Sequence, residues 1–222
     1  MGSGYITYHG VKKDYSSFKS LADRSITEVT AEILYGATKI REHCFEDCNA
    51  ITSIEIPNSV TSIGERAFWD CQLLTSANIP SSVTSIGKDA FNGCHALTGE
   101  IIIPNGVTSI SNNTFSGCYS LTSVTIPSSV TSIGSSAFSS CRALTSITIP
   151  SSVTSIGNSA FYGCSALTSV TVEATTPPTL GNNIVFYLNS VNLVIYVPSE
   201  SVEAYKTAAN WSTYASKIQA IP

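Results

Sequence analysis

Seven cysteines are the residues of this 222-residue chain best able to do chemistry, as zinc ligands, disulfide partners or nucleophiles. Six of them close a Phe-x-x-Cys pattern that recurs every 23 residues, with one step of 24: Cys48, Cys71, Cys94, Cys118, Cys141 and Cys164. Disulfide scaffolds space their cysteines irregularly through loops, whereas a constant period places each cysteine at one position of a repeating unit. We therefore predict free thiols that act as small buried hydrophobic groups, although neighbouring thiols could oxidise where the geometry permits.

Residues 42–48 form the densest group of possible metal ligands, with the sequence E-H-C-F-E-D-C. The segment has no Cys-x-x-Cys pair and no second ligand set, and Cys48 already belongs to the repeat. We predict no metal and no cofactor. No nucleophile elbow, zinc-protease motif, phosphate loop or dinucleotide fingerprint occurs, so we predict no catalytic residues and no enzyme. An enzyme would need a pocket with perturbed acid or base groups. His9 and His95 are interpreted as isolated, solvated or capping side chains.

The repeating unit predicts short elements that each turn one face inward. Val124, Thr125 and Ile126 alternate apolar and polar side chains, which is typical of a strand with one buried face, and Pro127 ends it. The spacing A-F-x-x-C-x-x-L predicts a single helical or 3-10 turn with Phe and Cys inward. Between the two, a glycine is interpreted as a residue with positive φ that turns the chain back over the core. It recurs at Gly64, Gly87, Gly134, Gly157 and Gly181.

A unit of 23 or 24 residues cannot enclose its own apolar side, so like positions of successive units must stack. We predict an α/β solenoid of about six units, with short stacked strands and single turns. The units cover residues 26–188, between an N-terminal cap of residues 1–25 and a C-terminal cap of residues 189–222, in one continuous domain. The extra residue of the 24-residue unit falls within 98–103 and predicts a strand bulge or a longer turn.

The two ends differ in composition from the repeats and are interpreted as lids over the terminal units. Residues 5–11 predict a small hairpin, and residues 16–22 predict one or two helical turns. Near the C-terminus, residues 193–197 predict a strand and Ser199 the N-cap of a helix. Trp211, Tyr214 and Ile218 then form an apolar stripe suited to covering the last unit.

The consensus L-T-S-V/I-T-I-P-S-S-V-T-S-I-G-x-x-A-F-x-x-C resembles the BspA-like leucine-rich repeat, over roughly residues 26–186. The C-terminal segment is similar to the terminal caps of BspA-like proteins in gut Bacteroidetes. Members of this family include bacterial and protozoan surface proteins implicated in adhesion to host cells, matrix proteins or other microbes. The resemblance implies a binding role outside the cell or on its surface, with a protein or a glycan of a host or microbial surface as partner. A fold alone does not fix a function.

The charge and hydropathy of the chain exclude several partners. Only 12% of the residues are charged and the net charge is −4, so no basic patch is available for nucleic acid. From residue 101 to residue 170 the only charged side chain is Arg142. No apolar run reaches the length of a membrane span, and residues 1–8 lack the regions of a secretory signal. We expect a monomer.

Departures from the repeat are the best candidates for a binding site, and they concentrate in the N-terminal half. The candidate ligand-binding residues are Glu55, Arg66, Trp69, Asn78 and Glu100. Exposed tryptophan beside arginine is a common interface anchor, although Trp69 could equally pack against the N-terminal lid. An outward row of Thr125, Thr148 and Thr171 suggests ice binding as an alternative, but threonine is also an ordinary strand residue.

The leading hypothesis is a non-enzymatic recognition or adhesion module that binds through a face of the solenoid. The alternative is a structural spacer or receptor-binding component of a larger surface or phage-tail assembly.

Overall fold

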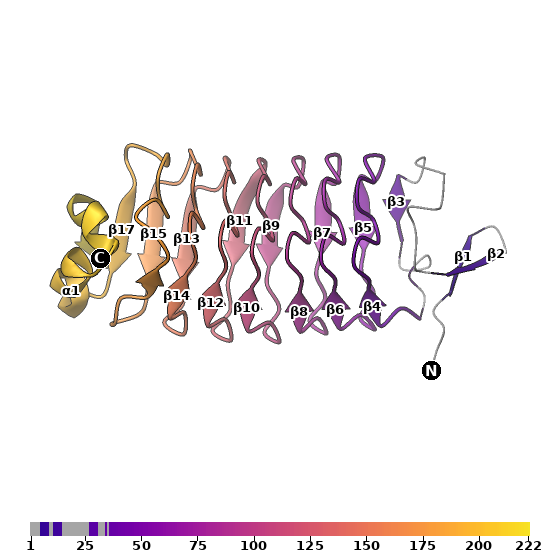
Figure 1. Cartoon of the computed structure of the whole chain (residues 1–222), viewed down its shortest axis with the longest axis horizontal. Helices are drawn as coiled ribbons and strands as arrows, with labels where there is room; N and C mark the ends of the chain where they lie inside the picture. The colour runs from indigo at the N-terminus through magenta and orange to yellow at the C-terminus, as the bar shows by residue number, and fades with distance from the viewer. Residues whose placement is uncertain (1–4, 9–10, 15–26, 31–33, 35) are drawn as a thin grey trace.

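A computed structural model describes residues 5–8, 11–14, 27–30, 34 and 36–222. The described chain is an elongated rod of about eight stacked turns, with its N- and C-terminal ends at opposite ends of the rod (Figure 1). Each regular turn of the coil has three sides: a strand of a long row, a strand of a short row, and a turn segment that carries Phe-x-x-Cys. The predicted α/β solenoid is confirmed.

The long row consists of parallel strands stacked along the rod, which Figure 1 shows along its upper part. In β13 the side chains of Ile147 and Ile149 point inward and those of Ser146 and Thr148 outward, as the alternating sequence predicts. The strands are β3 (Glu28–Val29), β5 (Ser53–Glu55), β7 (Ser76–Asn78), β9 (Gly99–Ile102), β11 (Leu121–Thr125), β13 (Ser146–Ile149), β15 (Ser169–Val172), β17 (Val194–Val197) and β18 (Ile218–Ala220).

The short row was not predicted, because each of its strands has two residues and gives too little periodicity to recognise. Each strand pairs a serine or another polar residue with one buried apolar residue, and all described pairs are parallel. The strands are β4 (Lys39–Ile40), β6 (Ser62–Ile63), β8 (Ser85–Ile86), β10 (Ser109–Ile110), β12 (Ser132–Ile133), β14 (Ser155–Ile156) and β16 (Thr179–Leu180).

The third side, here called the turn side, consists of residues 64–73 and their counterparts in the other units. The N–H of Cys71 donates to the carbonyl of Phe68, the bond of a 3-10 turn, whereas the N–H of Phe68 donates to Ala90 of the next unit at 2.8 Å. Residues at positive φ two positions before and two positions after the phenylalanine, such as Arg66 and Asp70, prevent a continuous helix. The turn side therefore joins successive units through its own backbone hydrogen bonds.

A stack of phenylalanine rings runs through the core from Phe45 to Phe186. Six successive ring pairs lie with centroids 5.1 to 5.6 Å apart, and their planes diverge by at most 14°. The last ring contacts Trp211 at 5.9 Å and the edge of Tyr214 at 5.5 Å. The same slot of every unit therefore supplies one continuous apolar column, as the repeat requires.

The cysteines form a second column beside the phenylalanines, and all seven are free thiols, as predicted. Each thiol from Cys71 to Cys164 donates to a phenylalanine carbonyl of the preceding unit, with Sγ···O distances of 3.0 to 3.3 Å. Burial raises the pKa of Cys44 and of Cys164 to about 12. The cysteine slot thus combines a small apolar volume with a weak donor that no aliphatic side chain would supply.

The recurring glycines serve close approach between units, so the prediction of positive φ at these positions is wrong. A Cβ on Gly157 would lie 2.4 Å from the backbone nitrogen of Ser135, and one on Gly64 would lie 2.4 Å from that of Glu42. The fourth unit has Ser111 here, whose hydroxyl donates to the carbonyl of Ile86 at 2.7 Å. In the regular units the glycine N–H makes the equivalent bond.

The 24-residue unit interrupts both rows of strands. Gly99 has φ 78°, and the register between β9 and β11 shifts between Leu121 and Ser123. The predicted irregularity is present, but the residue without a register partner is Thr122 of β11 and does not lie within 98–103. The hydrogen-bonded sheets end here, because neither β7 with β9 nor β8 with β10 forms a ladder. The core columns nevertheless continue, since Phe91 and Phe115 stack at 5.4 Å across the break.

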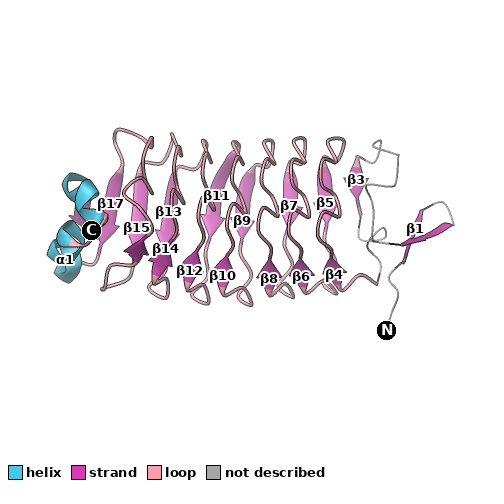
Figure 2. Cartoon of the chain, in the orientation of Figure 1, coloured by secondary structure: helices cyan, strands magenta, loops and turns pink. Residues whose placement is uncertain are grey.

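The two ends are built differently. β1 (Tyr5–Tyr8) and β2 (Val11–Asp14) pair antiparallel, as the hairpin prediction requires, whereas the helical turns predicted at 16–22 lie outside the described residues. The C-terminal end holds η2 (Ser199–Ser201), α1 (Val202–Thr207) and η3 (Trp211–Lys217), which are the helical elements of Figure 2.

At the C-terminal end the predicted N-cap is wrong, whereas the predicted apolar stripe is buried. Ser199 is not an N-cap, because it lies inside η2 and its hydroxyl donates to Glu200. Trp211, Tyr214 and Ile218 are buried, as expected of the apolar stripe. In the part of the chain that the structure describes, no helix is both long and apolar enough to cross a membrane.

Candidate functional site

The structure distributes the five sequence-predicted site residues over two sides of the coil. Glu55 and Asn78 are direct register partners on β5 and β7 and are exposed on the long row. Glu100 lies on β9 in the adjacent line of side chains, opposite Ser123, and its carboxylate accepts a hydrogen bond from Thr125 Oγ1 at 2.6 Å. These three residues therefore share the long row but not one line along it.

Arg66 and Trp69 lie together on the turn side. The guanidinium carbon of Arg66 is 5.7 Å from the centroid of the Trp69 ring. The guanidinium also lies 3.8 Å from Glu46 of the preceding unit and 3.9 Å from Asp89 of the next unit. The side chains of these two acids are only 8% and 6% exposed. Arg66 is therefore a counter-charge between two buried carboxylates. Trp69 is half-buried on this side and is more available to a ligand than Arg66.

A second group on the turn side escaped the sequence analysis. The rings of His95 and Tyr119 stack in parallel with centroids 4.4 Å apart, and the guanidinium carbon of Arg142 lies 4.3 Å from the centroid of Tyr119. The interpretation of His95 as an isolated side chain is therefore wrong. All three residues directly follow the repeat cysteine of successive units, and this shared slot was the signal that the sequence offered.

Most threonine hydroxyls on the two sheet sides are used by the fold. In one line along the short row, five threonine Oγ1 atoms donate to a carbonyl of the preceding unit at 3.1 to 3.3 Å: those of Thr61, Thr84, Thr131, Thr154 and Thr179. On the long row, the line of Thr125, Thr148 and Thr171 ends at Ile102 on one side and Tyr196 on the other. A line this short and irregular does not favour binding to an ice lattice.

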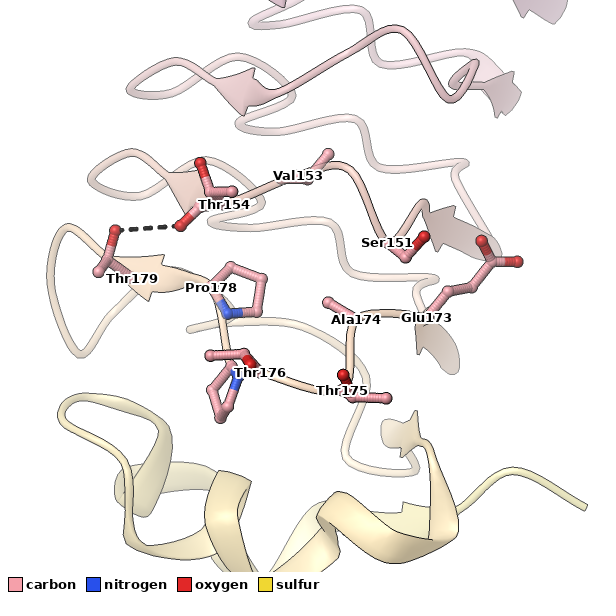
Figure 3. A pocket seen from close by; sticks show the side chains of 10 residues that line it. Ser151, Val153, Thr154, Glu173, Ala174, Thr175, Thr176, Pro178 and Thr179 are labelled. Carbon is pink, nitrogen blue, oxygen red and sulfur yellow. Dashed lines mark hydrogen bonds between the residues drawn. The ribbon is translucent and has the colours of Figure 1, made fainter.

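A pocket of about 390 Å³ lies between residues 151–154 and the loop of residues 173–179, where Glu173 replaces the proline of the other units (Figure 3). Its wall is the loop 173–178, which is fixed from behind by two hydrogen bonds. Tyr205 Oη donates to the carbonyl of Ala174 at 2.6 Å, and Trp211 Nε1 donates to that of Pro178 at 2.7 Å. The pocket is lined by hydroxyls, prolines and one carboxylate, and it contains no acid and base pair suited to catalysis.

The possible metal ligands of residues 42–48 do not converge. His43 Nδ1 lies 2.9 Å from Glu46 Oε2, Cys44 is buried with a raised pKa, and Cys48 Sγ donates to the carbonyl of Glu46. Within the described residues no group of three or more His, Cys, Asp or Glu side chains could hold a metal ion.

Comparison with known proteins places these features in a family. A profile described as BspA type leucine rich repeat region, with six copies, matches residues 15–100 and 98–209. No curated protein matches the chain.

Two solved structures resemble the fold. A leucine rich cell surface protein from Faecalibacterium prausnitzii A2-165 is 29% identical over 79% of this chain and 64% of its own, with a TM-score of 0.53. A leucine-rich repeat protein from Bacteroides ovatus ATCC 8483 is 27% identical over 88% of this chain and 54% of its own, with a TM-score of 0.60. The chain thus spans less than two thirds of the length of either relative. With its repeat spacing, its stacked fold and the profile that matches most of its length, the chain belongs to the BspA-type leucine-rich repeat family.

Proposed function

We propose that this protein is a non-enzymatic recognition module that adheres, at the cell surface or outside the cell, to a protein or a glycan of a host or microbial surface. The observation that carries the proposal is the concentration of aromatic and charged departures on the turn side. This set, here called the turn band, consists of Arg66, Trp69, His95, Tyr119 and Arg142, and its members pair through ring and guanidinium contacts.

The rest of the surface offers fewer candidates for binding, because many of its threonine hydroxyls already form hydrogen bonds within the fold. Threonines of the short row bond to neighbouring carbonyls, and the phenylalanine and cysteine columns are buried. Tryptophan, tyrosine and arginine are the residues most enriched among those that dominate binding energy at protein interfaces. The turn band places all three types on four successive units.

The alternatives receive less support. Leucine-rich repeat proteins of this family are in general binding modules without enzymatic activity. A spacer role within a larger assembly requires no half-buried tryptophan beside an arginine at the surface, and the comparisons give no support to a phage-tail component. The long row, with Glu55, Asn78 and Glu100, is the competing binding surface.

Binding of the purified chain to a glycan array, to immobilised matrix proteins and to epithelial and bacterial cells tests the proposal. We expect saturable binding to at least one of these surfaces, and a loss of roughly tenfold or more in affinity for Trp69→Ser. Serine already fills this slot in two other units, at Ser116 and Ser139, so the variant should fold.

Ile102→Thr is the matched control. Like Trp69→Ser it replaces a bulky side chain by the residue type found at that position in other units, but Ile102 is exposed on the long row. It should bind like the unchanged chain. Absence of binding to every surface, or a loss with Ile102→Thr but not with Trp69→Ser, would contradict the proposal.

A further inference from the structure

Three residues of the turn band form a stack whose spacing is set by the backbone. The carbonyls of His95, Tyr119 and Arg142 each accept a hydrogen bond from the unit that follows, from Ser120, Ala143 and Ala166, at 3.0 to 3.3 Å. These bonds hold the three side chains one unit apart. The imidazole covers one face of the Tyr119 ring, and the guanidinium lies over that ring at 4.3 Å.

Arg142 has no counter-charge among the described residues, unlike Arg66 and Lys88 of the earlier units. Arg66 and Lys88 lie within 4.0 Å of buried carboxylates. Among the residues described, the guanidinium of Arg142 has no salt bridge and donates no side-chain hydrogen bond, and the residue is exposed. It is also the only charged residue from 101 to 170. The Tyr119 ring supports the guanidinium from one side and accepts no hydrogen bond from its N–H groups, so these donors remain available to bind a carboxylate through two parallel hydrogen bonds.

Besides the Tyr119 ring, the turn of Arg142 and the equivalent slot of the next unit carry small hydroxylic residues. Ser140 lies in the same turn, and exposed Ser165 takes the equivalent slot of the next unit. Within the described part of the chain, the exposed large apolar side chains lie elsewhere, at Leu73, Ile102, Tyr187, Leu188, Val191 and Ile221. A peptide bound here would therefore find no apolar pocket for its side chains, whereas a sugar could exchange hydrogen bonds with the serine hydroxyls.

We propose that Arg142, held by Tyr119 and His95, binds the carboxylate of an acidic sugar, a sialic or uronic acid at the end of a glycan or within it. This inference deepens the proposed function, since it names the ligand chemistry of one part of the turn band. The stack fixes the arginine before the ligand arrives, so little side-chain freedom is lost on binding. Tyr119 and His95 are positioning residues, and Arg142 contacts the ligand.

Titration of the chain with 3′-sialyllactose and with a hyaluronan tetrasaccharide, followed by calorimetry and by the NMR resonance of the Arg142 side chain, tests the assignment. We expect one of the two to bind and to shift that resonance. The methyl ester of the same sugar, which keeps the hydroxyls but loses the charge, should bind at least about tenfold more weakly.

Arg142→Gln should abolish this binding. Arg142→Lys should weaken it by roughly tenfold, because an ammonium cannot form the paired bonds of a guanidinium. Tyr119→Leu should weaken sugar binding severalfold although it leaves the charge of Arg142 unchanged. Both positions are at the surface slot after the cysteine, where Ser165 shows that a small side chain is tolerated.

Several outcomes would overturn the inference: no binding by either acidic sugar, equal binding of the methyl ester, undiminished binding by Arg142→Gln, or binding of an acidic peptide with neither sugar. The proposed function has a separate readout. If Arg142→Gln still binds cells and Trp69→Ser does not, the recognition module stands and the acidic-sugar site is wrong.

Discussion

Raising the pH from about 9 to about 10 in a reducing buffer is expected to lower the free energy of unfolding by about 6 kcal/mol. Six buried cysteines carry a raised pKa because burial penalises the thiolate. In the unfolded chain these thiols lose their protons near the ordinary value of 9.0, whereas in the folded chain Cys44 and Cys164 do so at about 12. Between these values the unfolded state binds fewer protons than the folded state.

The sign of the effect follows from this difference. The contribution of the neutral thiols to stability is complete below pH about 9 and is lost as the pH rises toward the folded pKa values. Each thiol loses about 1.4 kcal/mol per pH unit once its unfolded form is ionised. Because a typical domain is stable by only about 5–15 kcal/mol in total, the protein should unfold in this alkaline range.

Denaturant titrations at a series of pH values from about 7.5 to about 10.5 measure the effect. Cys118→Ala is the matched control, because it removes one of six titrating thiols and should reduce the pH slope by about a sixth, whatever it does to stability at neutral pH. A free energy of unfolding that stays constant through this range would show that the cysteines are not buried in the folded protein.

Phe138→Ala should lower the free energy of unfolding by about 3–5 kcal/mol. The Phe138 ring is fully buried and stacks on Phe115 at 5.6 Å and on Phe161 at 5.4 Å, so its removal opens a cavity in the middle of the aromatic column. Because each unit contacts only its neighbours, the change should also weaken the coupling between the two halves of the rod.

Thermal and denaturant unfolding followed by circular dichroism measure this loss. Phe138→Leu is the control, because it keeps much of the volume and should cost less than about 1.5 kcal/mol. Equal stability of the alanine and leucine variants would contradict the column as the principal core.

Most of the architecture could be predicted from the sequence, because the same residues repeat at one spacing. Phe-x-x-Cys and Ile-Pro placed the core column and the long row correctly, and the extra residue near Gly99 indicated the irregular unit, although the unmatched residue lies on β11. The short row escaped because two residues such as Ser132 and Ile133 show no period. The role of Gly157 was misread because close approach of a neighbouring backbone and positive φ both require glycine, and only coordinates separate them.

The candidate site was less accessible to sequence reasoning. Arg66 and Trp69 lie three residues apart in one turn, so their contact could be anticipated, but the two carboxylates that flank Arg66 come from the neighbouring units. Tyr119 and Arg142 look like scattered single residues until the register of the turn side is known. A solenoid brings together residues one full unit apart, and side-chain contacts between units depend on rotamers that periodicity does not determine.

The central claim is that binding resides in the turn band and not in the repeat residues. Binding to the recognised cell or glycan surface should be measured for two multiple variants. One replaces four residues of the turn band by serine, which occurs at the same slots in other units, through Trp69→Ser, His95→Ser, Tyr119→Ser and Arg142→Ser. The other returns the long row to its common threonine through Glu55→Thr, Asn78→Thr and Ile102→Thr. Both should retain the circular dichroism of the unchanged chain. We predict that the first loses binding and the second keeps it; undiminished binding by the first variant would contradict the claim.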